Sequence, residues 1–202
     1  MPIGFDARRA VMQSRRHLPH LRQEGVVYFV TFRMADSVPQ ERLREWREEQ
    51  EARRRHAAPG DEDINRVQRQ IELWLDRGLG DCTLENPGAP AIVEETMRHF
   101  DRKRYFLDEF VVMPNHVHAL LEPLKGYELS EILRSWKLHS AREINRLLGR
   151  SGALWQSESF DHIVRDMQSL ERFRRYIRRN PAALRGRLSL VGRGSFQDRP
   201  GI

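Results

Sequence analysis

Cysteine is almost absent from this chain of 202 residues, in which Cys82 is the only one. A single thiol cannot form a disulfide within the chain, and without a second cysteine it does not make a thiolate metal site. The chain therefore gives no sign of the disulfide framework of a small secreted domain, and it fits a reducing compartment.

Long apolar runs are also missing. Charged residues interrupt the N-terminal stretch MPIGFDARRAVMQSRRHLPH before any apolar segment long enough for a signal peptide. No apolar run approaches the roughly 20 residues that a membrane-spanning helix needs. We therefore expect a cytoplasmic protein with no membrane partner.

Lysine is scarce, whereas arginine is abundant. Only three of the 35 basic residues are lysines, and 29 acidic residues leave a formal net charge of +6 and a pI near 10.1. Guanidinium groups suit bidentate contacts with phosphates, so this charge favours a polyanionic partner. A compositional bias of the genome explains the arginine preference equally well, so charge alone does not identify a nucleic-acid-binding protein.

Apolar periodicity and turn signals predict one domain over residues 1–202, built from strands that alternate with helices. We expect residues 1–25 to form a basic arm, 36–100 a helical insertion, and 104–180 the remaining core elements. The predicted strands are 25–33, 104–112, 116–122 and an irregular 154–166; the predicted helices are 38–55, 61–76, a short one from Pro90, 129–148, and 167–179, which Asp166 caps and Pro181 ends. This order predicts an α+β, ferredoxin-like fold, with one antiparallel sheet and helices packed on one face.

The stretch VVMPNHVH, residues 111–118, places two histidines just after a Pro-Asn turn. Side chains two positions apart in a strand project from the same face, so His116 and His118 are expected to point together. Two adjacent imidazoles can share one divalent metal ion, with oxygen ligands in the remaining positions. For a bare His-x-His motif, however, two histidines without a metal are the commoner arrangement.

A second candidate pair lies near the C-terminal end of the chain. Tyr176 and Asn180 are four residues apart in SLERFRRYIRRNP, so they are neighbours on the surface of one predicted helix. Both lie at the edge of its apolar stripe, from where a side chain can reach the sheet. Taken alone, a boundary tyrosine and a helix-end amide are the simpler interpretation of these residues.

The sequence resembles the REP-associated tyrosine transposases, a branch of the single-strand transposases with a His-hydrophobic-His motif. The resemblance rests on PHLRQEGVVYFVTFR, VVMPNHVHALLEP, LWQSESFDHIVRD and YIRRNP, and MPNHVH and the terminal Tyr-x-x-x-Asn-Pro are its most specific parts. It implies that His116, His118 and Asn180 bind Mg²⁺ or Mn²⁺ and that Tyr176 is the nucleophile. Relatives outside this branch often have glutamine at the position of Asn180; either amide offers a carbonyl oxygen to a hard cation.

The resemblance also implies the partner and the reaction. The expected partner is single-stranded or hairpin DNA, and the expected activity is that of a single-strand endonuclease and strand transferase acting at REP-type hairpins. Smaller relatives share active sites between two subunits, so both a monomer and a homodimer stay open. Residues expected to hold phosphates or to stack on unpaired bases are Arg33, Lys137, Arg142, Trp155, Phe160, Arg165, Arg175 and Arg179.

Two other functions are compatible with the same sequence. One is a non-catalytic hairpin-binding protein, a repressor or architectural factor, that keeps the fold. The other is a metal phosphoesterase that activates water and leaves Tyr176 unused. The presence of His116, His118, Tyr176 and Asn180 together favours the transposase, and a covalent adduct between the protein and DNA would exclude both alternatives.

Overall fold

The computed structural model of the protein describes residues 12–15, 19–38, 73–75, 77–184 and 187–199, together with Glu41 and Glu48. Most of the predicted basic arm and of the predicted helices 38–55 and 61–76 lies outside these residues. Glu41, Glu48 and residues 73–75, which are described, are helical.

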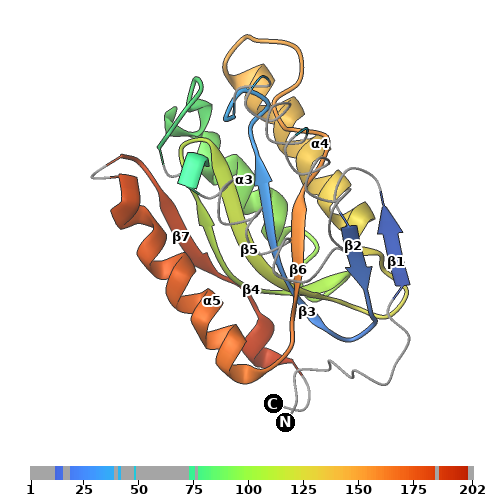
Figure 1. Cartoon of the computed structure of the whole chain (residues 1–202). Coiled ribbons are helices and arrows are strands. Elements are labelled where there is room, and N and C mark those ends of the chain that lie inside the picture. Colours follow the sequence, from blue (N-terminus) through green and yellow to red (C-terminus); the bar gives the residue numbers. More distant parts are fainter. Residues whose placement is uncertain are drawn as a thin grey trace.

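A five-stranded antiparallel sheet forms the centre of the described structure, with the strand order β6-β3-β5-β4-β7 (Figure 1). Its strands are β3 (Val27–Arg33), β4 (Tyr105–Val112), β5 (His116–Pro123), β6 (Phe160–Val164) and β7 (Leu190–Arg193). The helices are α3 (Ala89–Arg98), α4 (Leu129–Leu147) and α5 (Met167–Arg179), with short 3-10 turns at η1 (Thr83–Glu85), η2 (Asn180–Leu184) and η3 (Phe196–Asp198). None of the helices described is long and apolar enough to span a bilayer.

The first four strands of this sheet follow the ferredoxin-like order. The chain runs from β3 through α3 to β4, turns directly into β5, and then crosses through α4 to β6. In the sheet, β3 therefore lies between the third and the fourth strand of the series, and β4 lies next to β5. The predicted α+β fold with one antiparallel sheet is confirmed, and β7 adds a strand at the β4 edge.

Helices cover both faces of the sheet, which differs from the prediction of helices on one face. Alternate residues of β3, such as Tyr28, Val30 and Phe32, pack with α3 and α4. The intervening residues Val27 and Phe29 pack on the other side with α5. Because β3 is buried on both faces, each face needs its own helical cover. One face of the sheet therefore carries α3 and α4, and the other face carries α5.

The structure also contains elements that the sequence did not predict. Within the predicted basic arm, β1 (Met12–Arg15) pairs antiparallel with β2 (Pro19–Arg22) as a separate two-stranded sheet. At the other end, α5 ends at Arg179 as predicted, and the chain then continues through Pro181 in the 3-10 turn η2. Pro181 has no backbone N–H to donate, and the Asn180 backbone amide donates to the carbonyls of Ile177 and Tyr176 instead.

Candidate functional site

The two histidines of the VVMPNHVH stretch lie side by side on the face of β5 that α5 covers. In the register of the sheet, His116 lies opposite Arg33 and His118 lies opposite Thr31. Both histidines are fully buried, and their ring centroids are 4.6 Å apart. Strand alternation therefore places the two imidazoles together, as the sequence predicts.

Burial sets the protonation state of both histidines. Removal from water lowers the pKa of His116 to about 3. Burial also lowers the pKa of His118 well below its usual value, and the neighbouring His116 adds to this effect. Both imidazoles are therefore neutral at pH 7, which is the form that binds metal ions.

Each histidine has a hydrogen-bond partner for its Nδ1 atom. His116 Nδ1 lies 2.7 Å from Asn115 Oδ1, and His118 Nδ1 lies 2.8 Å from Thr31 Oγ1. His116 Nε2 is buried without any hydrogen-bond partner among the described residues. A buried imidazole nitrogen without a partner is costly unless a ligand satisfies it.

Helix α5 brings Tyr176 to the histidines. The helix begins where the Asp166 carboxylate accepts a hydrogen bond from the Ser169 amide at 2.6 Å, as its sequence predicts. Tyr176 Oη lies 3.5 Å from His118 Nε2, and the two ring centroids are 5.2 Å apart. The predicted nucleophile and one predicted metal ligand thus meet at this face of the sheet.

Asn180 caps the C-terminal end of α5 and is only 4% exposed. Its side-chain oxygen, Oδ1, is buried and has no hydrogen-bond partner among the described residues. A buried carbonyl oxygen without a hydrogen-bond partner suits a hard cation such as Mg²⁺. An unpartnered imidazole nitrogen such as His116 Nε2 suits a divalent transition-metal ion. The residues present therefore suit a divalent ion with mixed nitrogen and oxygen ligands. Within the described parts of the chain, no cluster of three or more His, Cys, Asp or Glu side chains could hold a metal ion, so the candidate site depends on the Asn180 amide as well as the two histidines.

Two ion pairs hold α5 against β4. Arg174 Nε donates to Asp108 Oδ2 at 2.9 Å, and both side chains are at least nine-tenths buried. One turn later, Arg178 makes a two-pronged contact with the carboxylate of Glu109, at 2.6 and 2.8 Å. Asp108 and Glu109 lie where the β4–β5 register shifts. The irregular strand thus presents two consecutive carboxylates to the helix that carries Tyr176.

The structure corrects the prediction that Trp155 stacks on DNA bases. Trp155 is 7% exposed, its indole N–H donates to Ser140 Oγ at 2.9 Å, and its ring packs edge-on against Phe32. These contacts place it in the core between the sheet and α4. Trp155 fills space between the sheet and α4, and its ring is too buried to stack on a base.

The other predicted DNA-binding residues lie in different settings. Lys137 is half-buried and donates to the carbonyls of Gln156 and Ser157, at 3.2 and 2.7 Å, so its ammonium ties α4 to the segment before β6. Arg142 is exposed on α4 and pairs with Glu143. Arg165, Arg175 and Arg179 are exposed at or on α5, whereas Arg33 and Phe160 are half-buried on β3 and β6. A role in DNA binding for these residues stays a prediction.

The sequence did not predict Asn115 and Thr31 as hydrogen-bond partners of the histidines. The position of Asn115 directly before His116 could have indicated this contact, but its place in a Pro-Asn turn favoured a role in the turn only. Thr31 had none, because it lies 87 residues before His118 and meets it only through the pairing of β3 with β5.

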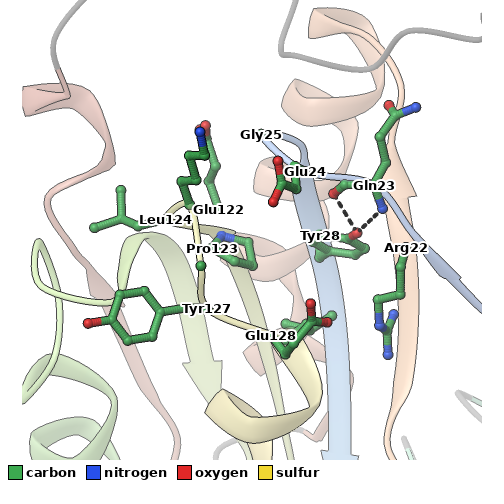
Figure 2. A pocket seen from close by; sticks show the side chains of 13 residues that line it. Arg22, Gln23, Glu24, Gly25, Tyr28, Glu122, Pro123, Leu124, Tyr127 and Glu128 are labelled. Atoms are coloured by element: carbon green, nitrogen blue, oxygen red, sulfur yellow. Dashed lines mark hydrogen bonds between the residues drawn. The ribbon is translucent and has the colours of Figure 1, made fainter. Parts of the chain in front are cut away.

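A cavity of about 580 Å³ lies at the other end of β3 and β5, away from the histidines. Figure 2 shows Tyr28, Tyr127 and the carboxylates of Glu24 and Glu128 around it. The phenol of Tyr28 is occupied there, since it donates to the Gln23 carbonyl and accepts from the Gln23 amide. None of the predicted site residues lines this cavity.

The buried histidines predict a loss of stability in acid. A histidine whose folded pKa lies below its unfolded value stabilises the fold above about pH 6.5, and this contribution falls as the pH drops toward the folded pKa. His116 alone is expected to cost roughly 2 kcal/mol between pH 7 and pH 5. Thermal melts in chelator should show a smaller loss over this range in His116→Gln than in the parent or in His139→Gln, which alters an exposed histidine. Equal losses in all three proteins would contradict the neutral, buried state of His116.

Residues 89–180 match the model of the family described as "Transposase IS200 like". The matched segment runs from the start of α3 to the end of α5, and it includes His116, His118, Tyr176 and Asn180.

Three individual proteins are similar to parts of this chain. A protein of Haemophilus influenzae without an assigned function is 29% identical; the match covers 37% of this chain and 53% of that protein, so this chain spans about half the length of the relative. A structure of a REP-associated tyrosine transposase bound to a REP hairpin is 15% identical, with a TM-score of 0.47 over 85% of this chain and 73% of that one. A crystal structure of a candidate transposase from Deinococcus radiodurans is also 15% identical, with a TM-score of 0.34 over 84% of this chain and 98% of that one.

Proposed function

We propose that this protein cleaves and rejoins single-stranded DNA through a covalent bond to Tyr176, in keeping with the match of residues 89–180 to the family model described as "Transposase IS200 like". The ion that assists the reaction, Mg²⁺ or Mn²⁺, would be held by His116, His118 and Asn180. The substrate class, REP-type hairpins, follows from the resemblance of the MPNHVH and Tyr-x-x-x-Asn-Pro motifs.

One observation carries the proposal more than any other. Of the buried polar side-chain atoms that have no hydrogen-bond partner among the described residues, two are predicted ligand atoms, His116 Nε2 and Asn180 Oδ1. His116 lies on β5 and Asn180 caps α5, and the same two elements bring Tyr176 Oη to 3.5 Å from His118 Nε2. Buried polar atoms without partners are uncommon in proteins, and a missing ion is one of the explanations for them. An amide oxygen and imidazole nitrogens beside a phenol fit metal-assisted attack by the phenol on a phosphate.

The reaction exchanges one phosphate ester for another. The phenol oxygen of Tyr176 would form a bond to the phosphorus, the bond from phosphorus to the 3′ oxygen would break, and the phenol proton would end on the departing 3′ hydroxyl. The products are a 5′-phosphotyrosine and a free 3′ hydroxyl, and the reverse attack rejoins a strand. No water is consumed, so the energy of the phosphodiester is kept.

Tyr176 needs help to act as a nucleophile. A phenol with an ordinary pKa near 10 is ionised to about one part in a thousand at pH 7. The positive charge of a bound divalent ion would stabilise the negative charge on the scissile phosphate and the negative charge that develops on the leaving oxygen. The chain itself positions the phenol, because Tyr176 packs edge-on against Phe29 and His118, with ring centroids 6.0 and 5.2 Å away. This packing restricts the ring before DNA arrives.

Arginines around α5 would hold the DNA backbone. Arg172, Arg175 and Arg179 follow one another at spacings of three and four residues, so they share one side of the helix, and all three are exposed. Arg165 is exposed just before the helix begins. Such contacts give affinity for phosphates without reading sequence. They would place a single strand along the helix that carries Tyr176.

The metal role is tested by His116→Ala and His118→Ala. Both variants are expected to lower cleavage by at least roughly a thousandfold, because a bound ion contributes several kcal/mol to the charge stabilisation of the reaction. Affinity for DNA should change by less than about threefold, since arginines carry it. Cleavage of hairpin oligonucleotides in Mn²⁺ is followed on denaturing gels, and binding by fluorescence anisotropy.

His139→Ala is the matched control, because it removes an exposed histidine on α4. It should cleave as the parent does. An equal loss of cleavage and binding in His116→Ala and His118→Ala would contradict the metal role and point to a general loss of the fold.

A further inference from the structure

Asn115 lies in the turn between β4 and β5 and is fully buried. All of its side-chain hydrogen-bonding groups are in use. Its Oδ1 lies 2.7 Å from His116 Nδ1, and its Nδ2 donates to the backbone carbonyls of Leu79 and Leu75, at 2.9 and 3.4 Å. Its own carbonyl accepts from the Met34 amide at 2.9 Å. One side chain thus joins a candidate metal ligand to a distant part of the chain.

These contacts fix the orientation of the Asn115 amide. Only the NH₂ group can donate to two carbonyl oxygens, so Nδ2 must face Leu75 and Leu79, and Oδ1 must face His116. A carbonyl oxygen only accepts, which requires His116 Nδ1 to carry the proton. In a neutral imidazole the other nitrogen is then unprotonated, and His116 Nε2 presents a lone pair.

The partner of the second histidine does not impose such a choice. Thr31 Oγ1 can either donate to His118 Nδ1 or accept from it, because a hydroxyl group does both. The tautomer of His118 is therefore free to follow its surroundings, whereas that of His116 is set by Asn115.

We propose that Asn115 is a positioning residue, which holds His116 in the Nδ1–H tautomer and keeps its Nε2 lone pair ready for a divalent cation. The two carbonyls of Leu75 and Leu79 act as the brace for Asn115, so part of the chain before α3 supports the candidate metal site. This inference deepens the proposed function, and its metal-binding consequence rests on it.

The brace is itself well anchored. Leu75 is buried against Val38. Gly80 has a φ of +87°, and a Cβ atom there would lie 2.8 Å from the Asp36 carbonyl oxygen, so the two segments approach as closely as glycine allows. Beside it, the Asp81 amide donates to Asp36 Oδ2 at 2.7 Å. The carbonyls that hold Asn115 therefore lie next to close contacts with Asp36 and Val38.

Two substitutions separate the orienting contact from the brace. Asn115→Leu removes the acceptor for His116 and both donors to the brace. Asn115→Asp keeps an oxygen that accepts from His116 Nδ1 but removes both hydrogen bonds to the carbonyls of Leu75 and Leu79, because a carboxylate cannot donate. Asn145→Leu is the matched control, because Asn145 donates to the Gly152 carbonyl near the end of α4, outside the candidate site.

The first measurement is the tautomer of His116, read from nitrogen NMR of protein labelled at histidine and freed of metal with chelator. The parent, Asn115→Asp and Asn145→Leu should show His116 protonated at Nδ1. Asn115→Leu should show a shift toward protonation at Nε2. The second measurement is the affinity for Mn²⁺ alone, which should fall about 10- to 100-fold in Asn115→Leu and by less than about threefold in Asn145→Leu.

A protonated Nε2 in the metal-free parent would overturn the proposal whether or not any variant folds. An unchanged tautomer and unchanged Mn²⁺ affinity in a folded Asn115→Leu would also overturn it, since Asn115 would then serve the fold alone. If the parent itself binds no Mn²⁺, the proposed function fails, while the tautomer result still decides whether Asn115 orients His116.

Discussion

Replacing Tyr176 with phenylalanine is expected to remove every covalent adduct between the protein and DNA. The substitution deletes one oxygen and keeps the ring that packs against Phe29 and His118. Fold, metal binding and DNA affinity should therefore be preserved, whereas cleavage should fall to background and not merely slow, because the nucleophile is gone. Denaturing gels of hairpin oligonucleotides incubated in Mn²⁺ measure the outcome.

The other three tyrosines are poor substitutes. Tyr28 is 2% exposed on the opposite side of the sheet, and its phenol is bonded to Gln23. Tyr105 is 1% exposed, accepts from the Trp136 indole and donates to the Met97 carbonyl, and burial raises its pKa to about 12. Tyr127 is 42% exposed and lines the cavity at the far end of β3 and β5.

Peptide mapping of the adduct formed by the parent identifies the attacked residue directly. A nucleotide on a peptide that contains Tyr28, Tyr105 or Tyr127 would refute the assignment, as would any adduct that persists in Tyr176→Phe. Tyr127→Phe is the matched control, since it removes an exposed phenol outside the site, and it should form the adduct at the parental rate.

Local patterns predicted the parts of the fold and site that depend on neighbouring residues. The β4–β5 hairpin followed from two strand-like runs around Pro114 and Asn115, and α5 followed from its Asp166 cap and apolar spacing. Strand alternation placed His116 beside His118 for the same reason. The family match over residues 89–180 agrees with the resemblance carried by these segments.

Long-range pairing could not be predicted in the same way. The contact of Thr31 with His118 depends on the register of β3 and β5, and the brace on Asn115 depends on carbonyls about 40 residues away. Every residue has a backbone carbonyl, so the sequence does not indicate which carbonyls accept hydrogen bonds from Asn115. The sequence also did not predict that α5 lies on the face of the sheet opposite α3 and α4. The apolar stripe of a helix shows that it packs on a sheet, but not which face of the sheet it covers.

The ion pair of Arg174 with Asp108 predicts the largest effect on stability. In Asp108→Ala the guanidinium stays buried with only the carboxylate of Glu171 left beside it, at 2.5 Å. Breaking a buried pair by removing one partner costs about 3–5 kcal/mol, because the remaining charge has lost its compensation. For a domain of this size, that corresponds to a fall in Tm of roughly 6–20 °C.

An exposed pair provides the matched control. Arg102 and Asp198 form an ion pair in which both side chains are more than half exposed, so Asp198→Ala should change stability by less than about 1 kcal/mol. Thermal and urea unfolding of the two variants measure the difference. A cost in Asp108→Ala no larger than that in Asp198→Ala would show that the buried pair does not hold α5 in place.

Removing both charges distinguishes the cost of an unpaired charge from the value of the pair. The double variant Asp108→Leu/Arg174→Leu should recover most of the stability that Asp108→Ala loses, since apolar residues of similar volume often replace a buried pair without loss. Cleavage should not recover fully, because only one of the two ion pairs between α5 and β4, that of Arg178 with Glu109, would remain to fix the distance from Tyr176 to His118. Full recovery of both stability and cleavage would mean that α5 is positioned by its apolar contacts alone.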